Sequence, residues 1–292
     1  MNAVVTYVDG LDPLWREDYI RTVGPSILNK RFRDWGTLKY HFRGLDRFMP
    51  FIDKIHLVVA RESQVPAWVN RETVNVVLHR DIIPAEYLPT FNSSMIEMFL
   101  HRIPGLSEQY LYFNDDMYTV APCSEEDFFP EGVPSMGFSR SFLRGGDFRY
   151  LVFHSDSLAR KAAGMRPGWR YVRPQHTASP MLKSVCDEVY SLVEKEILSS
   201  LSPLRTRANY NQYLFLDYMY YKGLARHRRL SNKHFSLAAA SIGKICAFLR
   251  NPSTKMVCIN DVQMSQEKFT ACREALLRAF EDILPEKSRY ER

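Results

Sequence analysis

The acidic end of one apolar segment is the part of this chain whose residue types are best suited to chemistry. Residues Tyr110–Asp116 read YLYFNDD, an apolar run that ends in Asn114 and two adjacent carboxylates, Asp115 and Asp116. Such a run is typical of a buried strand, and ligands of open α/β sheets collect at the carboxyl ends of strands. Adjacent carboxylates repel unless they are compensated, and Mg²⁺ or Mn²⁺ takes oxygen ligands of this kind. The alternative is an ordinary turn, because Asn and Asp are common turn formers.

Two further apolar segments end in acids, which turn chemistry alone explains poorly. The polar residues that follow them are Asp9, Gly10 and Asp12 after residues 3–8, and Asn260 and Asp261 after residues 256–259. Arginines stand in short polar segments between these ends, at Arg31, Arg33 and Arg207. Metal-binding acids together with arginines that neutralise phosphate oxygens are what phosphoryl transfer requires. The pattern therefore favours a phosphate-bearing substrate.

A general base is also needed, and His176 in RPQHTASP is the best placed candidate because it lies in a loop before a helical pattern. The alternative is an ordinary polar loop histidine. From the residues we expect Asp115 and Asp116, aided by Asp261, to hold a divalent cation.

The elements that position these residues alternate between strands and helices. Strands are predicted over 3–8, 52–60, 74–78 and 110–113, with helices over 38–48 and, after a cap at Asn92 or Ser93, over 95–103. This order predicts an α/β fold with a Rossmann-like, mostly parallel sheet flanked by helices. The C-terminal half adds helices over 181–198, 210–224 and 265–284 and a strand over 256–259. An aromatic stripe in the helix over 210–224 is expected to be core.

We expect one catalytic domain over 1–292. Its parts are an α/β core at 1–120, a loop-rich excursion at 121–170, a helical segment at 171–250, and a final strand and helix at 251–292 that return to the core.

Composition limits the partners and the compartment. The chain has 292 residues, a net charge of +6 and a pI near 9.0, so anionic partners are expected: an acidic membrane surface or a phosphorylated small molecule. Nucleic acid is not expected, because no zinc finger, RNP-like motif or phosphate loop occurs. The five cysteines show no paired spacing, and no apolar window approaches the roughly 20 residues of a membrane span. We expect a cytoplasmic protein with peripheral contact at an anionic membrane surface.

Five segments, taken in order, resemble the conserved regions of the Stealth family of sugar-1-phosphate transferases. The family includes bacterial capsular and cell-wall polysaccharide phosphotransferases and is related to the catalytic subunit of the lysosomal-enzyme N-acetylglucosamine-1-phosphotransferase. The most specific segment is LPTFNSSMIEMFLHRIPGLSEQYLYFNDD. The others are YVDGLDP, RFRDWGTLKYHFRGL, PQHTASPMLK and VCINDV. The chain departs from the family pattern at Thr37–Tyr40, where Glu-Leu-Arg-Tyr is usual, and at Thr177-Ala178.

The resemblance implies transfer of a sugar-1-phosphate from a nucleotide-sugar, expected to be a UDP-sugar, to a hydroxyl of a saccharide acceptor that can be lipid-linked. A phosphodiester forms and a nucleoside monophosphate leaves, in capsule or exopolysaccharide synthesis. Catalytic positions fall on His176, Asp116, Glu97 and Arg207. Substrate contacts are expected at Asp9, Gly10, Asp12, Arg31, Arg33, Asn92, Asn114 and Asn260. Two other functions stay open: a metal-dependent glycosyltransferase that releases a nucleoside diphosphate, and a non-catalytic binding module.

Overall fold

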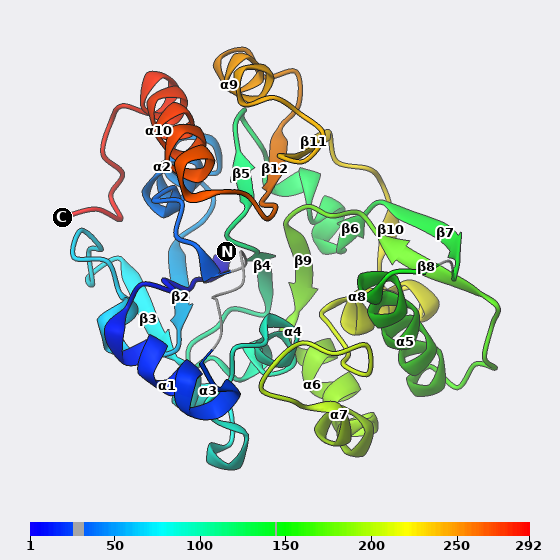
Figure 1. Ribbon diagram of the computed structural model, residues 1–292. Coiled ribbons are helices and arrows are strands. Elements are labelled where there is room, and N and C mark those ends of the chain that lie inside the picture. The colour runs from blue at the N-terminus through cyan, green and yellow to red at the C-terminus, as the bar shows by residue number, and fades with distance from the viewer. Residues whose placement is uncertain (26–31, 144) are drawn as a thin grey trace.

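A five-stranded sheet forms the centre of the N-terminal half (Figure 1), in a computed structural model that describes residues 1–25, 32–143 and 145–292. Its strand order is β3-β2-β1-β4-β9, where β3, β2, β1 and β4 are parallel and β9 runs antiparallel to β4. The strands are β1 (Asn2–Thr6), β2 (Lys54–Val59), β3 (Val74–Leu78), β4 (Gln109–Phe113) and β9 (Ser179–Leu182). The predicted mostly parallel sheet is confirmed.

Both faces of this sheet are buried, which explains the continuous apolar runs in its strands. Side chains alternate along β1, so Ala3 and Val5 pack in one cluster with Phe42, whereas Val4 packs in another with Leu214. The first cluster includes α2 (Leu38–Phe48), and the second includes α8 (Tyr213–Tyr221). The predicted helix over 38–48 is confirmed. Of the aromatic stripe, Tyr213, Phe215 and Tyr218 lie in the core as expected, whereas Tyr210 and Tyr221 are only partly buried.

The segment after β1 forms a helix, α1 (Pro13–Val23), where the sequence predicted a continued turn. The Asp12 carboxylate accepts a hydrogen bond from Trp15 N at 2.6 Å and caps this helix, and Pro13 occupies its first turn. A capping acid followed by proline is a helix start, because the cap satisfies a free amide and proline lacks one. Trp15 and Tyr19 then pack against Phe32 and Phe91.

The helix predicted over 95–103 is divided into two short pieces. α4 (Ser93–Glu97) begins at the cap Asn92 and ends within two turns, and a 3₁₀ turn, η4 (Leu100–Arg102), follows. Phe99, between them, has φ −116° and ψ 1°, which breaks the α-helical hydrogen bonding. Glu97 and His101 therefore do not share one helix face.

A second, three-stranded sheet lies beside the first. Its order is β11-β12-β5, with β11 parallel and β5 antiparallel to β12. The strands are β5 (Met117–Thr119), β11 (Asn232–Ser236) and β12 (Met256–Asn260), covered by α9 (Ile242–Arg250) and α10 (Gln266–Ile283). The C-terminal strand thus pairs with β5, and α10 packs on α2 through stacked Tyr40 and Phe280 rings.

The region expected to be rich in loops contains a 16-residue helix, α5 (Asp147–Ala162). The strands that precede and follow it in the chain, β7 (Phe138–Phe142) and β8 (Arg170–Pro174), pair antiparallel, and β6 (Ser135–Met136) pairs with β10 (Arg226–His227). The helical pattern over 181–198 becomes β9 and two helices, α6 (Lys183–Leu192) and α7 (Glu194–Ser200). Short elements complete the described chain: η2 (Glu62–Gln64), α3 (His79–Ile82), η3 (Ala85–Tyr87), η5 (Glu125–Asp127) and η6 (Pro130–Gly132).

Among the helices described, none combines the length and the apolar character needed to cross a bilayer. All five cysteines are buried and free of disulfides.

Candidate active site

The turn between β4 and β5 brings the two sheets together at its acids. Met117 N donates to Asn114 O at 3.2 Å to close the turn, and Ile259 N donates to Asp116 O at 2.9 Å. The end of β12 is therefore fixed against the acidic turn. This contact places Asp261, just beyond β12, near enough to Asp115 to influence its charge.

Asp116 lies in a cluster with His176 and Cys258, whose ligand atoms are within 4.8 Å of one another. Cys258 Sγ donates to Asp116 Oδ2 at 3.4 Å, while Asp116 Oδ1 is buried and accepts no hydrogen bond within the described chain. A buried carboxylate oxygen without a donor is costly unless a ligand or a cation satisfies it.

Asp115 has a shifted pKa because charge is crowded here. Its side chain reaches solvent, yet protein surrounds it closely, and this burial together with the neighbouring Asp116 carboxylate raises its pKa to about 7. Asp34 and Asp261 act in the same direction. Three acids that raise the pKa of Asp115 form, together with it, an arrangement that a cation would stabilise.

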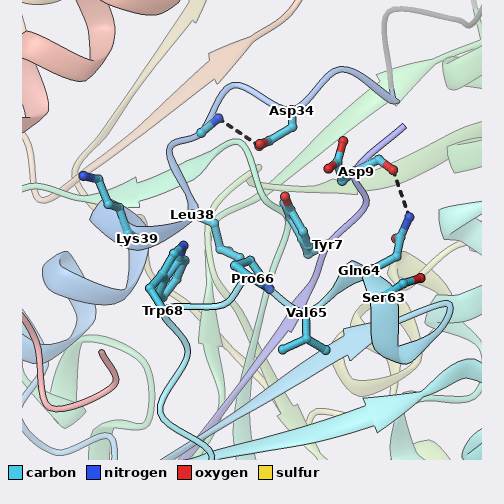
Figure 2. A pocket seen from close by; sticks show the side chains of 11 residues that line it. Tyr7, Asp9, Asp34, Leu38, Lys39, Ser63, Gln64, Val65, Pro66 and Trp68 are labelled. Atoms are coloured by element: carbon cyan, nitrogen blue, oxygen red, sulfur yellow. Dashed lines mark hydrogen bonds between the residues drawn. The ribbon is translucent and has the colours of Figure 1, made fainter. Parts of the chain in front are cut away.

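A pocket of about 190 Å³ opens beside this cluster at the end of β1 (Figure 2). The Tyr7 hydroxyl and the carboxylates of Asp9 and Asp34 face its interior. Burial, and then the negative charge of Asp34, raises the pKa of Tyr7, so the hydroxyl stays a donor. Gln64 Nε2 donates to Asp9 O at 2.9 Å, and Gly36 N donates to Asp34 Oδ1 at 2.8 Å.

Asp34 is a residue that the sequence reasoning missed. It stands between Arg33 and Trp35 in RFRDW, a segment in which only the arginines were singled out. Burial raises its pKa, although the Gly36 amide and the Arg273 guanidinium oppose that shift. Its signal was an acid flanked by an arginine and an aromatic residue outside any predicted element.

Arginines approach the acids from two segments. Arg33 Nη2 donates to Met264 O at 3.0 Å, its guanidinium lies over the Phe269 ring, and its Nη1 is buried without a hydrogen-bond partner in the described chain. Arg273 of α10 lies against Gly36, where an added Cβ would come within 2.6 Å of Arg273 Nη2. Arg31 lies outside the described residues.

Gly10 allows the close approach of the loop that carries Arg33 and Asp34. Gly10 N donates to Phe32 O at 2.8 Å, and a Cβ at Gly10 would lie 2.3 Å from that oxygen. Any side chain here would push the loop away. Gly10 therefore serves the site by letting two backbones meet.

His176 is half-buried and held from the second sheet. Asn232 Nδ2 donates to His176 O at 3.1 Å, and the Tyr213 hydroxyl lies 3.5 Å from His176 Nδ1. Burial lowers the pKa of His176, and the Asp116 charge opposes this shift in part. A neutral imidazole next to Asp116 can accept a proton.

Behind the acids lies a buried network that holds them in place. Glu97 accepts hydrogen bonds from Gln212 N at 2.9 Å and from the Tyr112 hydroxyl at 3.3 Å, and Arg205 lowers its burial-raised pKa in part. Gln212 Nε2 in turn lies 3.5 Å from Asn114 Oδ1. Glu97, 5% exposed, is thus placed to position Asn114 through Gln212, and its catalytic role stays a prediction.

Several expected site residues make other contacts in the structure, and their roles toward a substrate stay predictions. Asn92 is fully buried and caps α4. Asp12 is committed to capping α1, and Asn260 is exposed at the end of β12. Arg207 pairs with Asp147 and lies over the Tyr150 ring at the start of α5, and none of these contacts reaches the acids after β4.

The residues present fit a hard divalent cation. Carboxylate oxygens of Asp115, Asp116 and Asp261 are the ligands that Mg²⁺ or Mn²⁺ takes, and Asp116 Oδ1 lacks a donor. Burial and Asp116 raise the pKa of Cys258 far enough to keep it a thiol.

Comparison with known proteins agrees with this geometry. The profile of Stealth protein CR2, conserved region 2, matches residues 31–135. The chain is 30% identical to the capsular polysaccharide phosphotransferase WcwK of Streptococcus pneumoniae, over 100% of this chain and 99% of that protein. The chain belongs to the Stealth family of polysaccharide phosphotransferases. It is thus a transferase, as the resemblance implied.

Another Stealth relative is the receptor polysaccharide phosphotransferase WefC of Streptococcus oralis, which is 31% identical over 100% of this chain and 99% of that protein. Among solved structures, the chain is similar to the galactosyltransferase LgtC with a TM-score of 0.42 and 11% identity, over 94% of this chain and 96% of that one. A similarity this distant says nothing about the reaction of this Stealth protein.

Proposed function

We propose that this protein transfers a sugar-1-phosphate from a nucleotide-sugar to a hydroxyl of a saccharide acceptor in capsule or exopolysaccharide synthesis. The observation that carries the proposal is the neutral His176 beside Asp116 in a group of acids that calls for a cation. Family membership, with relatives named as polysaccharide phosphotransferases, supports it. The donor is expected to be a UDP-sugar.

In the proposed reaction His176 removes the proton of the acceptor hydroxyl. The acceptor oxygen then attacks the phosphorus bound to the sugar, and the bond to the nucleotide oxygen breaks in line. The products are a phosphodiester between two sugars and a nucleoside monophosphate. The lowered pKa of His176 supports its role as base, because the imidazole is unprotonated at neutral pH.

Arginines neutralise the phosphate oxygens of the donor. Arg33 suits this role because its Nη1 has no hydrogen-bond partner in the described chain, and Arg273 acts on the neighbouring Asp34. Arg207 is the second arginine that the sequence put forward, and its role stays a prediction. Asp115, Asp116 and Asp261 would hold the cation, which when bound supplies charge neutralisation to the pyrophosphate.

The pocket at Tyr7, Asp9 and Asp34 is the proposed donor side of the site. Its donors and acceptors, including the Tyr7 hydroxyl and Gln64, are of the kind that bind ribose hydroxyls and base edges. We place the reaction in the cytoplasm, with a lipid-linked acceptor and peripheral contact with anionic membrane as further parts of the proposal.

Identifying both products tests the proposal. The protein is incubated with Mg²⁺ or Mn²⁺, a panel of nucleotide-sugars and saccharide acceptors, and the released nucleotide is identified by chromatography. We expect a nucleoside monophosphate, with a phosphodiester signal in the phosphorus NMR spectrum of the saccharide product. A nucleoside diphosphate and a plain glycoside would overturn the proposal in favour of a glycosyltransferase. Binding without turnover would indicate a binding module.

A further inference from the structure

One face of the antiparallel strand pair β7–β8 carries a row of aromatic and cationic side chains. The paired residues of the two strands are Phe138 with Pro174, Arg140 with Val172, and Phe142 with Arg170. Alternate residues of a strand point to the same face, so Phe138, Arg140 and Phe142 share one face, together with the residues opposite them on β8. Aromatic and guanidinium groups alternate along it.

The outer end of this face is an exposed aromatic stack. Trp169 is 73% exposed and Phe142 is 41% exposed, and their rings lie 5.1 Å apart. The Arg170 guanidinium lies 4.6 Å from the Phe142 ring and 4.9 Å from the Trp169 ring. Large aromatic side chains that remain exposed in a row mark a binding surface more often than chance exposure does.

The inner end of the face is hollowed. A cavity of about 360 Å³ is lined by Phe138, Ser139, Arg140, Val172, Tyr220 and His227, and its volume falls within the range of about 300–1,000 Å³ for ligand sites. The Tyr220 and Phe138 rings lie 4.7 Å apart. His227 Nδ1 accepts from Phe138 N at 3.0 Å, which leaves Nε2 of a neutral ring as a donor.

This hollow connects directly to the segment that carries His176. β8 ends at Pro174, and Gln175 N donates to Gly137 O at 2.6 Å. Gln175 Nε2 also donates to Leu230 O. Gln175, which directly precedes His176, is therefore held against both Gly137 and Leu230. With its five residues, β8 spans about 16 Å, long enough for several sugar units in line with the proposed base.

We propose that this face, defined by Phe138, Arg140, Phe142, Trp169, Tyr220 and His227, is a binding track for the acceptor saccharide chain. The inference rests on the proposed function, because that function supplies a saccharide acceptor. Sugar rings have an apolar face of C–H groups that packs on aromatic rings, and hydroxyl groups that accept from Arg140 and His227. The arginines also suit a saccharide that already carries phosphodiesters.

A membrane surface fits this face less well. An interfacial membrane contact buries a continuous apolar surface with cations around it. Here the cations alternate with the rings, and the inner end of the face is concave. The saccharide is therefore the occupant that the chemistry favours, and a membrane contact is an outcome of the test.

The test measures saccharide binding apart from turnover. Wild type, Trp169→Ala and Arg140→Ala are applied to an array of bacterial polysaccharides and of their short and long fragments. Both side chains are exposed, so neither variant should fail to fold. We expect wild type to bind at least one saccharide, with long fragments bound more tightly, and each variant to bind the long fragments about tenfold more weakly.

Matched controls are Leu192→Ala, an exposed apolar residue at the end of α6, and Arg278→Ala, an exposed arginine of α10. Both should bind saccharide as wild type does. Vesicles of phosphatidylglycerol and phosphatidylcholine form the other arm. Wild type that binds no saccharide, variants that bind as well as wild type, or a Trp169→Ala loss confined to vesicles would each overturn the track.

The result separates the track from the reaction. If the released nucleotide is a monophosphate and the variants bind saccharide normally, the proposed function stands and the track fails. If no nucleotide is released but saccharide binding depends on Trp169 and Arg140, the face binds saccharide, but the proposed function fails and so does the assignment of that saccharide as the acceptor.

Discussion

At the scale of single residues, Asp116 is the most exacting position of the site. It links the two sheets through its backbone oxygen, accepts from the Cys258 thiol, and keeps one buried carboxylate oxygen without a donor. These three features make it the acid whose charge is hardest to replace. A neighbour such as Asp115, which is open to solvent, has more freedom.

Asp116→Asn removes one negative charge and keeps the side-chain shape. We expect kcat/KM to fall about 100-fold or more, because charge compensation at a phosphoryl centre contributes several kcal/mol. The melting temperature should change little, and titration with Mn²⁺ should show weaker binding. Near-normal turnover by this variant would remove Asp116 from the cation site.

Arg33→Lys keeps the positive charge but loses the planar guanidinium. One guanidinium nitrogen of Arg33 donates to Met264 O, and another has no hydrogen-bond partner in the described chain. An ammonium group does not reproduce this arrangement. The expected loss in kcat/KM is about 10- to 100-fold, which corresponds to a charged hydrogen bond. Steady-state kinetics with the preferred donor measure it.

Arg207→Lys is the companion variant. If Arg207 binds phosphate oxygens as the sequence predicts, it should show a loss similar to that of Arg33→Lys. Unchanged kinetics would restrict Arg207 to its exposed pair with Asp147.

At the scale of elements, the contact between α5 and α8 contains two buried acids in opposite circumstances. Asp156 accepts from Arg160 Nε, Val172 N and the Tyr221 hydroxyl, whereas both carboxylate oxygens of Asp217 lack a partner in the described chain. Burial holds the pKa of Asp217 well above its usual 3.8. The unsatisfied Asp217 therefore weakens the contact between α5 and α8, whereas the hydrogen-bonded Asp156 strengthens it.

Asp217→Asn should stabilise the protein at pH 8. A carboxyl whose pKa is raised by folding contributes most stability below about pH 4, and that contribution is lost as the pH rises. The neutral variant should gain about 1–3 kcal/mol in the free energy of unfolding at pH 8, and the gain should shrink toward pH 4. Urea unfolding at the two pH values measures it.

Asp156→Asn is the control for this comparison. It weakens a satisfied network, so it should destabilise the protein at pH 8. A destabilised Asp217→Asn protein at pH 8 would contradict the interpretation of that buried acid.

Helix α1 offers a second prediction at this scale. Asp12→Ala removes the carboxylate that accepts from Trp15 N, so the free energy of unfolding should fall by about 1 kcal/mol. Thermal unfolding monitored by circular dichroism would measure this loss. A large fall in kcat with unchanged stability would instead return Asp12 to the substrate-binding residues that the sequence predicted.

At the scale of the whole molecule, the sequence predicted the parallel sheet because strands buried on both faces consist of continuous apolar residues. It also predicted α2 and the terminal helix α10, whose apolar periodicity is clear. It missed α1, since Asp12-Pro13 is compatible with both a turn and a helix start. It missed α5, whose pattern is obscured by glycines and aromatic residues before it.

The site was predictable where chemistry follows a strand and was not predictable where tertiary contacts decide. Asp115, Asp116 and Asp261 follow β4 and β12, and the structure brings them together. Glu97 and Asn92 have the right residue types, but burial commits them to structural hydrogen bonds. Asp34 and Arg273 come together only because the loop that carries Asp34 and Gly36 folds against α10, which no local pattern encodes.

The pairing of β12 with β5 has a consequence for how the protein is made. In a chain leaving the ribosome, the four parallel strands β1 to β4 are complete by Phe113, long before β12 emerges. Asp116, however, meets Cys258 only when β12 has emerged. Translation that stops before that strand would yield a product that holds a folded sheet but lacks the partner of its central acid. The newly synthesised polypeptide thus acquires its complete acid cluster only after β12 has been made.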